Sequence, residues 1–278
     1  MITEQQRIER RAGVGSSDSP IIMGFSGYKT PYQLYRDKLG LDSDAEDKET
    51  ELQYWGNQLE PLIVSHFRRL HDVDVTLPDT LVSKEYPHMR ANLDGWIPEW
   101  NAVLEVKCSD KYMRNEWGVD GTDTIPMLYL VQVAHQCIVT NADKGIIAVL
   151  IGGNEYREFT YQRHAEFEQT IIDATSAFWF DNVLAKVEPE SITIDDSRLK
   201  YREVNPDTSV RANDEMLACI ETLSLTKSQL KELDKIEKQA KMKVMEFMQH
   251  NECLVNESGQ PLVSYKADAR GNRRFLVK

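Results

Sequence analysis

The sequence has few cysteines, no long apolar run and no excess of positive charge. Its four cysteines are widely spaced and form no Cys-x-x-Cys pair; they are Cys108, Cys137, Cys219 and Cys253. This spacing predicts neither a structural zinc site nor a disulfide framework. The longest apolar run, residues 146–151, is far too short to cross a membrane, and no charged-then-apolar leader opens the chain. We therefore expect a soluble, cytoplasmic protein without a membrane partner.

The charge balance is acidic, with 45 Asp and Glu against 33 Lys and Arg and a formal net charge of −12. That charge is unusual for a protein that neutralises DNA phosphates. Residues 42–51 hold six acids against Lys48 alone, so one solvated connector carries much of the excess. The basic residues cluster elsewhere, and each cluster is either solvated surface or part of a DNA channel. The clusters are Lys107, Lys111 and Arg114 with Tyr112 and Trp117; Arg68 and Arg69; and Lys266, Arg270, Arg273, Arg274 and Lys278.

Length and composition predict one large domain, or one domain with an appendage. The 278 residues are 41% apolar, which is enough for a sizeable core. Asn205-Pro206-Asp207 marks a break, so we place a first domain at residues 1–204 and an extension at residues 205–278. The apolar repeat of residues 208–250 predicts helices, with a helical hairpin as one arrangement, and Thr226 and Gln229 have capping-box spacing. We expect this extension to pack on the core and to end in a β-hairpin whose turn is at residues 257–260.

Two acids and a lysine stand on adjacent predicted strands. Asp94 precedes Gly95, and Glu105 and Lys107 alternate with apolar residues on one strand, so their side chains share a face. If residues 98–101 form a hairpin loop, Asp94 lies opposite Glu105 with Cβ atoms about 5 Å apart. Their repulsion would be about 3 kcal/mol at an effective dielectric near 20, which favours a bound cation. Oxygen ligands indicate Mg²⁺ or Mn²⁺. The alternative is a solvated strand face.

Two predicted helices contribute further polar residues. Leu59, Ile63, Phe67 and Leu70 recur at helical spacing beside Glu60. Because Pro61 is unfavourable in a helix interior, the helix either begins near Glu60 or kinks there. A second helix should follow Pro126, with Tyr129, Gln132 and Gln136 on one face and His135 packed inside.

The N-terminal region has the features of an anion site. Gly13 and Gly15 permit close backbone approach, and Ser19-Pro20 is typical of an N-cap and first helical residue. A helix N-terminus attracts phosphate through free amides and its dipole. The alternative is an ordinary capped surface helix.

The ordered set of these motifs resembles the PD-(D/E)XK nuclease superfamily, and within it the phage lambda-exonuclease and YqaJ-type viral recombinase family. The matching stretches lie between about residues 8 and 165; they are residues 11–18, 55–60, 93–95, 104–108 and 129–132. The resemblance implies an α/β core with a mixed central sheet flanked by helices. It also implies a phage- or prophage-encoded enzyme, acting in a bacterial host, that uses Mg²⁺, or Mn²⁺ as a substitute, with two ions per active site.

The same resemblance implies an exonuclease that degrades the 5′-ended strand of double-stranded DNA. The product would be a 3′ overhang for a single-strand annealing protein, and the enzyme would form a ring-shaped homotrimer around DNA. The alternatives are an endonuclease of the same superfamily and a catalytically silent DNA-end-binding scaffold. The complete set of Asp94, Glu105 and Lys107 disfavours the silent scaffold.

The resemblance also assigns residue roles. Asp94, Glu105 and the backbone carbonyl of Val106 would bind the metals, and Glu60 would complete the second metal site. Lys107 would position or activate the attacking water, with Gln132 near the active centre. Arg11 and Ser17 would bind a 5′-phosphate of DNA; a one-residue adjustment in the alignment leaves Arg10 as an alternative to Arg11.

Overall fold

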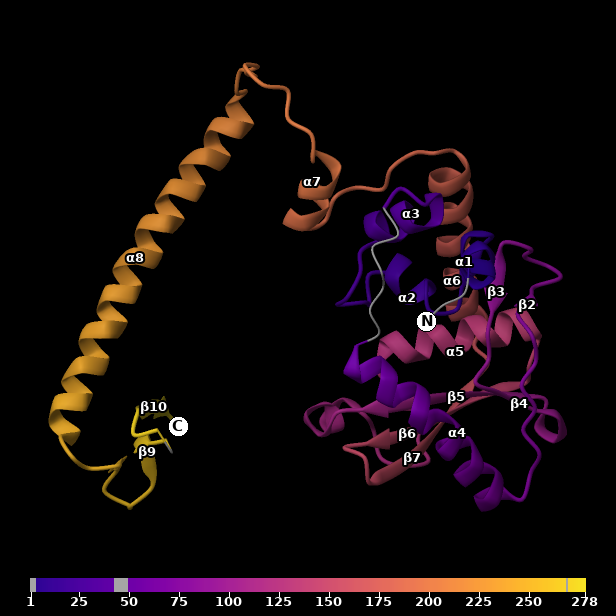
Figure 1. Ribbon diagram of the computed structural model, residues 1–278, viewed down its shortest axis with the longest axis horizontal. Helices are drawn as coiled ribbons and strands as arrows, with labels where there is room; N and C mark the ends of the chain where they lie inside the picture. The colour runs from indigo at the N-terminus through magenta and orange to yellow at the C-terminus, as the bar shows by residue number, and fades with distance from the viewer. Residues whose placement is uncertain (1–3, 43–49, 269) are drawn as a thin grey trace. The chain divides into compact units, whose positions relative to one another are not determined.

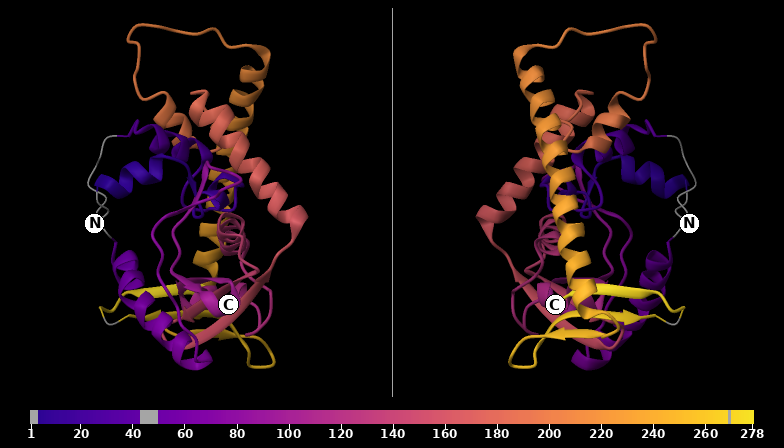
Figure 2. Two further views of the ribbon diagram at one scale, coloured as in Figure 1. Left: turned by 90° about the vertical axis from the view of Figure 1, so that its right-hand side faces the viewer. Right: turned by 90° about the vertical axis from the view of Figure 1, so that its left-hand side faces the viewer.

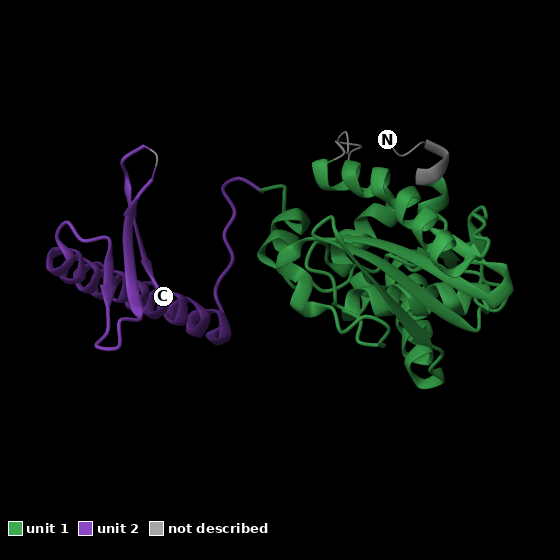
Figure 3. Ribbon diagram, turned by 90° about the horizontal axis from the view of Figure 1, so that it is seen from below, with its two compact units in different colours: residues 1–204 green, residues 205–278 purple. Residues whose placement is uncertain are grey.

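The computed structural model describes residues 4–42, 50–268 and 270–278 (Figure 1). The chain divides into two compact units, residues 1–204 and residues 205–278 (Figure 3). Residues 43–49 of the predicted acidic connector lie outside the described residues. Packing of the extension on the core stays a prediction. No helix among the described residues is both long and apolar enough to span a bilayer.

A four-stranded mixed sheet is the centre of the first unit (Figure 1). Its strands are β4 (Gly95–Ile97), β5 (Ala102–Ser109), β6 (Lys144–Ile151) and β7 (Glu155–Gln162), in that order. The β4–β5 and β6–β7 pairs are antiparallel, whereas β5 and β6 are parallel. Ile97 pairs with Ala102 across the short helix η1 (Pro98–Trp100), so the predicted hairpin register is confirmed.

The two helices predicted around the sheet pack on its opposite faces. Leu104 and Val106 of β5 join Ile63 and Phe67 of α4 (Glu51–His71) in one apolar cluster. Val103 faces the other way, into a cluster with α5 (Met127–Thr140). A parallel pair such as β5–β6 needs a long crossover, and α5 provides it. The strand that carries Glu105 is therefore covered by a helix on each face.

A small sheet and three helices precede this core. The sheet pairs β1 (Val14–Gly15), β3 (Met89–Ala91) and β2 (Leu81–Val82), and the helices are α1 (Glu4–Arg11), α2 (Ser19–Ile22) and α3 (Pro31–Leu39). The close approach predicted at Gly13 is confirmed, because a Cβ there would lie 2.6 Å from the His88 carbonyl oxygen. After the sheet come α6 (Ala165–Ala177), η3 (Phe178–Leu184) and α7 (Ile194–Lys200). Buried Asp196 accepts a 2.7 Å hydrogen bond from Thr30 and so ties α7 to the start of α3.

The second unit consists of one long helix and a three-stranded sheet (Figure 2). Helix α8 (Asp214–Met248) is continuous for 35 residues, so the expected helical hairpin is wrong. Its N-cap is Asn213, and Thr226 lies in its interior, because no Gly or Pro between 214 and 248 ends the helix earlier. The strands β8 (Cys253–Val255) and β9 (Pro261–Ala267) confirm the predicted hairpin, and β10 (Arg273–Val277) adds a strand on the other side of β9.

Candidate active site

Asp94 and Glu105 meet at the point where the β4–β5 hairpin opens. Gly95 pairs with Leu104, so Asp94 and Glu105 are the next residues in register. The Asp94 carboxylate accepts a 2.8 Å hydrogen bond from the Val106 backbone N–H. Gly95 is required beside it, because a Cβ there would lie 2.5 Å from a Val75 methyl carbon. The backbone thus fixes where Asp94 stands relative to β5.

Helix α5 holds the Glu105 carboxylate with two glutamines. Gln132 Nε2 donates to Glu105 Oε1 over 2.6 Å, and Gln136 Nε2 donates to Oε2 over 2.5 Å. Glu105 is only 1% exposed, and Gln136 is fully buried. The helical spacing of four residues places both amides over the same carboxylate. The sequence placed Gln136 on this face of the helix, but its hydrogen bond to Glu105 requires the pairing of α5 with β5, which the sequence alone did not define.

Lys107 completes this group on the same face of β5. Its ammonium forms an ion pair with Glu105 and lies 5.4 Å from the centre of the Tyr129 ring. Tyr129 stacks on Trp117 with ring centres 5.1 Å apart. Trp117 is buried, so its expected place in a surface cluster is wrong: the indole packs the core behind Lys107. Arg114 of that cluster is exposed but forms a 2.6 Å ion pair with Glu155.

Glu60 lies within α4, and not at its beginning. The helix begins nine residues earlier, at Glu51, where Thr50 and Gln53 form a capping box, and it continues through Pro61. A start near Glu60 is therefore wrong, because this strong cap nucleates the helix upstream. Ile63 and Phe67 are buried as predicted, whereas Leu70 is exposed and lies outside the stripe.

Burial and the charges of neighbouring groups shift the pKa values of Glu60, Asp94 and Lys107. Burial, and then the charge of Glu105, raise the pKa of Glu60. Burial and Glu105 also raise the pKa of Asp94 well above its ordinary value, with Glu60 adding to the effect. Burial alone would lower the pKa of Lys107, but Glu105 and Asp94 outweigh it and the pKa is raised. One ammonium therefore faces three carboxylates, and the site has an excess of negative charge in a poorly hydrated place.

The donor chemistry of the site suits a hard divalent cation. Carboxylate oxygens and a backbone carbonyl are the ligands that Mg²⁺ and Mn²⁺ take in proteins. Among the residues that the structure describes, no three His, Cys, Asp or Glu side chains are arranged as a metal-binding cluster. Glu105 is instead turned toward the α5 glutamines and Lys107. Its Oε1 contacts both Gln132 and Lys107, whereas Oε2 accepts from Gln136 alone, so a lone pair of Oε2 is left for a metal.

The N-terminal motif differs from the capped helix expected from the sequence. Helix α2 has only four residues, and its N-cap is Asp18, not Ser19. The buried Ser19 hydroxyl instead forms a 2.6 Å hydrogen bond with Nδ1 of His135. A helix this short has a weak dipole, so it offers no anion site by itself. His135 is fully buried between Ser19 and the Arg90 carbonyl, as a packed residue should be.

The residues assigned to the 5′-phosphate, Arg11 and Ser17, both lie in this motif before α2. Arg11 Nε donates to the Asp37 carbonyl over 3.2 Å, at the C-terminal end of α3. Ser17 is exposed in the loop before α2, and Arg10 is also exposed. Buried Lys38 forms a 2.5 Å ion pair with Asp18 and so fixes this loop against α3. The motif contacts α5 through the hydrogen bond between Ser19 and His135, the residue next to Gln136.

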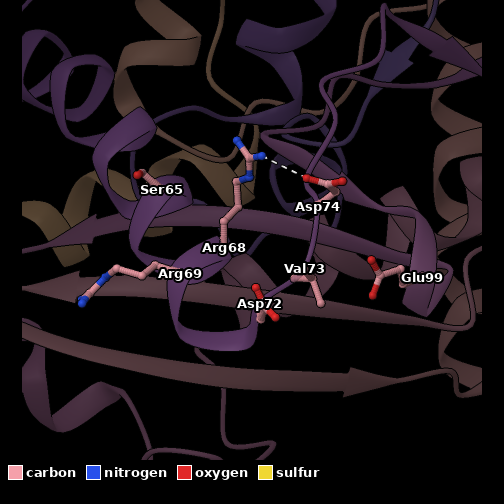
Figure 4. A pocket seen from close by; sticks show the side chains of 7 residues that line it. All are labelled: Ser65, Arg68, Arg69, Asp72, Val73, Asp74 and Glu99. Carbon is pink, nitrogen blue, oxygen red and sulfur yellow. Dashed lines mark hydrogen bonds and ion pairs between the residues drawn. The ribbon is translucent and has the colours of Figure 1, made fainter.

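Arg68 and Arg69, which the sequence also allowed as part of a basic channel, line a different pocket at the C-terminal end of α4 (Figure 4). Arg68 forms a 3.0 Å ion pair with Asp74, and Arg69 contacts Nδ1 of His66 at 3.1 Å. The other lining residues are Ser65, Asp72, Val73 and Glu99. With three acids beside two arginines, this pocket is not a basic surface, and the solvated-surface interpretation holds there.

The model of the YqaJ-like viral recombinase domain matches residues 8–143. A Bacillus subtilis (strain 168) protein named YqaJ is 30% identical over 97% of this chain and 87% of its own length. Among solved structures, the alkaline exonuclease LHK-Exo of Laribacter hongkongensis superposes with a TM-score of 0.54 at 16% identity, covering 66% of this chain and 94% of its own. A putative exonuclease from Eubacterium rectale gives a TM-score of 0.52 at 10% identity, covering 75% and 96%.

At such low identity the two solved structures establish the fold alone, a mixed sheet flanked by helices as in these two exonuclease structures. The relative that aligns over nearly the whole chain establishes the family. The chain belongs to the YqaJ-like viral recombinase family.

Proposed function

We propose that this protein is a metal-dependent deoxyribonuclease that degrades the 5′-ended strand of double-stranded DNA from its end. The observation that carries the proposal is the buried Glu105, paired with Lys107 and next in register to Asp94. The similarity of the fold to an alkaline exonuclease and to a putative exonuclease supports it. The product would be a 3′ overhang for a single-strand annealing protein, which fits a viral recombinase family.

The proposed metal site uses residues from both strands of the hairpin and from α4. Asp94, Glu105 and the Val106 carbonyl would hold Mg²⁺, or Mn²⁺ in its place, and Glu60 would complete a second site. Two such ions, if bound there, would neutralise the phosphate and lower the pKa of the attacking water. The excess of negative charge among the three acids supports this set, because a cation offsets the repulsion by Glu105 that, after burial, raises the pKa of Glu60 and of Asp94.

The other residues position the reacting groups. Gln132 fixes one oxygen of Glu105 and thereby limits how its carboxylate rotates. Lys107, held by Glu105 and beside the Tyr129 ring, keeps its ammonium directed into the site, where it can orient water and the scissile phosphate. Arg11 and Ser17 would bind the terminal 5′-phosphate, which would set the polarity.

End-labelled linear duplexes and closed circular duplexes, each with and without Mg²⁺, test the proposal. We expect digestion of linear DNA only with Mg²⁺, with label at the 5′ terminus released first. Rapid cutting of closed circles would favour an endonuclease, and tight end binding without cleavage would favour a silent scaffold. Ca²⁺ as the sole metal should support binding but little hydrolysis, because its looser coordination misplaces the nucleophile.

A further inference from the structure

The C-terminal part of the chain has a charge balance opposite to that of the rest. Residues 1–204 contain 21 Lys and Arg against 34 Asp and Glu, whereas residues 227–278 contain 11 against 7. The basic part comprises the second half of α8 and the sheet β8–β10. The placement of its charges decides whether they stabilise the fold or remain available to a ligand.

Two of these cations lie directly opposite each other on neighbouring strands. In the antiparallel register of β9 and β10, Lys266 pairs with Arg274, and both side chains are exposed. The ion pairs found among the described residues include neither of them. Like charges placed opposite on one face destabilise the pair by up to about 1 kcal/mol. An anion bound between the two side chains would remove that repulsion.

Among the described residues, no acid forms an ion pair with either of these two cations. Asp268 lies just beyond the end of β9, and its carboxylate accepts hydrogen bonds from the backbone N–H groups of Arg270 and Asn272, each at 2.9 Å. This carboxylate is therefore used by the turn. The turn in addition presents Arg270, a third exposed cation at the end of the hairpin.

Side chains on the opposite face of the sheet make contacts within the second unit. Arg273, adjacent to Arg274, donates to the carbonyls of Gln249 and Asn251 at 2.7 Å each and to that of Tyr265 at 3.0 Å. Its guanidinium lies 3.8 Å from the centre of the Tyr265 ring. The Lys241 ammonium lies 5.2 Å from the Phe275 ring on the same side. The rings of Tyr265 and Phe275 are thus already in contact with cations of the same unit.

We propose that the exposed face of β9 and β10, with Lys266, Arg274 and Arg270, binds the phosphate backbone of duplex DNA without sequence preference. Platforms for single strands stack bases on aromatic side chains, and both rings of β9 and β10 lie on the other face. Cations without aromatics recognise phosphates, which carry no base information. The proposal rests on the proposed function, which makes DNA the substrate. It gives an acidic chain a DNA contact in addition to those of the proposed active site.

Fluorescence anisotropy of full-length protein with a labelled duplex tests the surface. A chelator is present throughout, so hydrolysis does not contribute. We expect Lys266→Ala/Arg274→Ala to weaken binding and to reduce the slope of log Kd against log salt by about two, since each lost phosphate contact removes about 0.9. An unchanged Kd and slope would overturn the proposal. A loss confined to a single-stranded probe would overturn the assignment to duplex DNA.

A matched pair of substitutions controls for net charge. Arg198→Ala/Lys238→Ala also removes two exposed cations, but these form ion pairs with Asp195 at 2.8 Å and Asp234 at 2.7 Å. Their loss should leave the salt slope unchanged. A slope reduced equally by both pairs would mean that only overall charge matters and would overturn the specific site.

A charge reversal separates binding from folding. Lys266→Glu places an acid opposite Arg274, so it should keep or raise the unfolding temperature while it weakens DNA binding more than Lys266→Ala does. If Lys266→Glu bound duplex like the intact protein, the site would be wrong. Failure of the proposed function is seen separately, because an intact protein that cleaves no DNA with Mg²⁺ would still show this binding difference in chelator.

Discussion

Gln136 Nε2 donates to Glu105 Oε2 over 2.5 Å, one helical turn beyond the Gln132 that holds Oε1. The same amide nitrogen reaches the Asn92 carbonyl at 3.3 Å, next to the strand that leads to Asp94. The side-chain amide oxygen Oε1 of Gln136 is buried, and none of the described residues donates a hydrogen bond to it. An unmet acceptor costs about 1–3 kcal/mol, so Gln136 is placed here at the expense of stability. Its position indicates that it orients Glu105.

Gln136→Leu should reduce the rate of DNA hydrolysis by about 10- to 100-fold while leaving Kd for duplex DNA in chelator unchanged. The loss follows because one oxygen of Glu105 is then free to rotate away, as for other residues that orient metal ligands. Steady-state cleavage and anisotropy measure the two quantities. Cys137→Ala is the control, since its thiol is buried on the same helix but lies beside Gly145. Equal effects of the two substitutions would mean that Gln136 acts through packing alone.

The buried His135 predicts a pH dependence of stability. Burial lowers its pKa to about 4 from 6.5, against smaller raising effects of the Arg90 carbonyl and Asp18, while His88 and Lys38 lower it further. The unfolded chain therefore takes up the proton first. The contribution is complete above pH 6.5 and is lost as pH falls toward 4, by about 3 kcal/mol in total.

Urea unfolding of the intact protein and of His135→Asn, each followed from pH 7 to pH 4, measures this difference. The variant should start less stable, because the bonds to Ser19 and Arg90 are impaired, but its stability should fall less as the solution is acidified. Parallel pH profiles would contradict the assignment of this dependence to His135.

Local patterns predicted the β4–β5 hairpin and the shared face of Glu105 and Lys107 well. Alternation on β5 placed Glu105 and Lys107 on one face, and helical spacing placed Gln132 and Gln136 on another. Predictions failed where distant packing decides, as for Trp117, which resembles a surface aromatic in sequence but stacks on Tyr129. Its hydroxyl makes Ser19 a candidate helix N-cap in the sequence. In the fold this hydroxyl instead forms a hydrogen bond with His135, 116 residues away. A local sequence pattern cannot predict a contact between residues so far apart in the chain.

Arg11→Ala should narrow the difference in digestion rate between 5′-phosphorylated and 5′-hydroxyl duplex ends. The prediction rests on the matching motif and on the position of Arg11, which ends α1 and donates to the Asp37 carbonyl of α3. It lies beside the loop that Lys38 fixes through Asp18. Rates on the two kinds of end are compared for the intact protein, Arg11→Ala and Arg10→Ala. A change only in Arg10→Ala would transfer the role to Arg10, and equal rates on both ends in the intact protein would remove the phosphate pocket.

Light scattering should give a mass near three subunits, and digestion of long duplexes should continue when excess unlabelled DNA is added after initiation. A chain with a net charge of −12 holds DNA more readily when the basic residues of several subunits converge on it. Ring enclosure also prevents release as salt weakens the phosphate contacts. A monomeric mass, or arrest by the added DNA, would show that this chain forms no ring.

Neutral isosteres of the two strand acids test the central claim most directly. Asp94→Asn and Glu105→Gln should each reduce Mg²⁺-dependent hydrolysis of linear duplex below about one hundredth of that of the intact protein. Thermal unfolding of Asp94→Asn at pH 7 should occur at no lower temperature, because burial and Glu105 already disfavour the charged form of Asp94. Glu99→Gln, in the loop of the same hairpin, should leave hydrolysis unchanged. Near-normal hydrolysis by Asp94→Asn or Glu105→Gln, in a folded protein, would contradict the site.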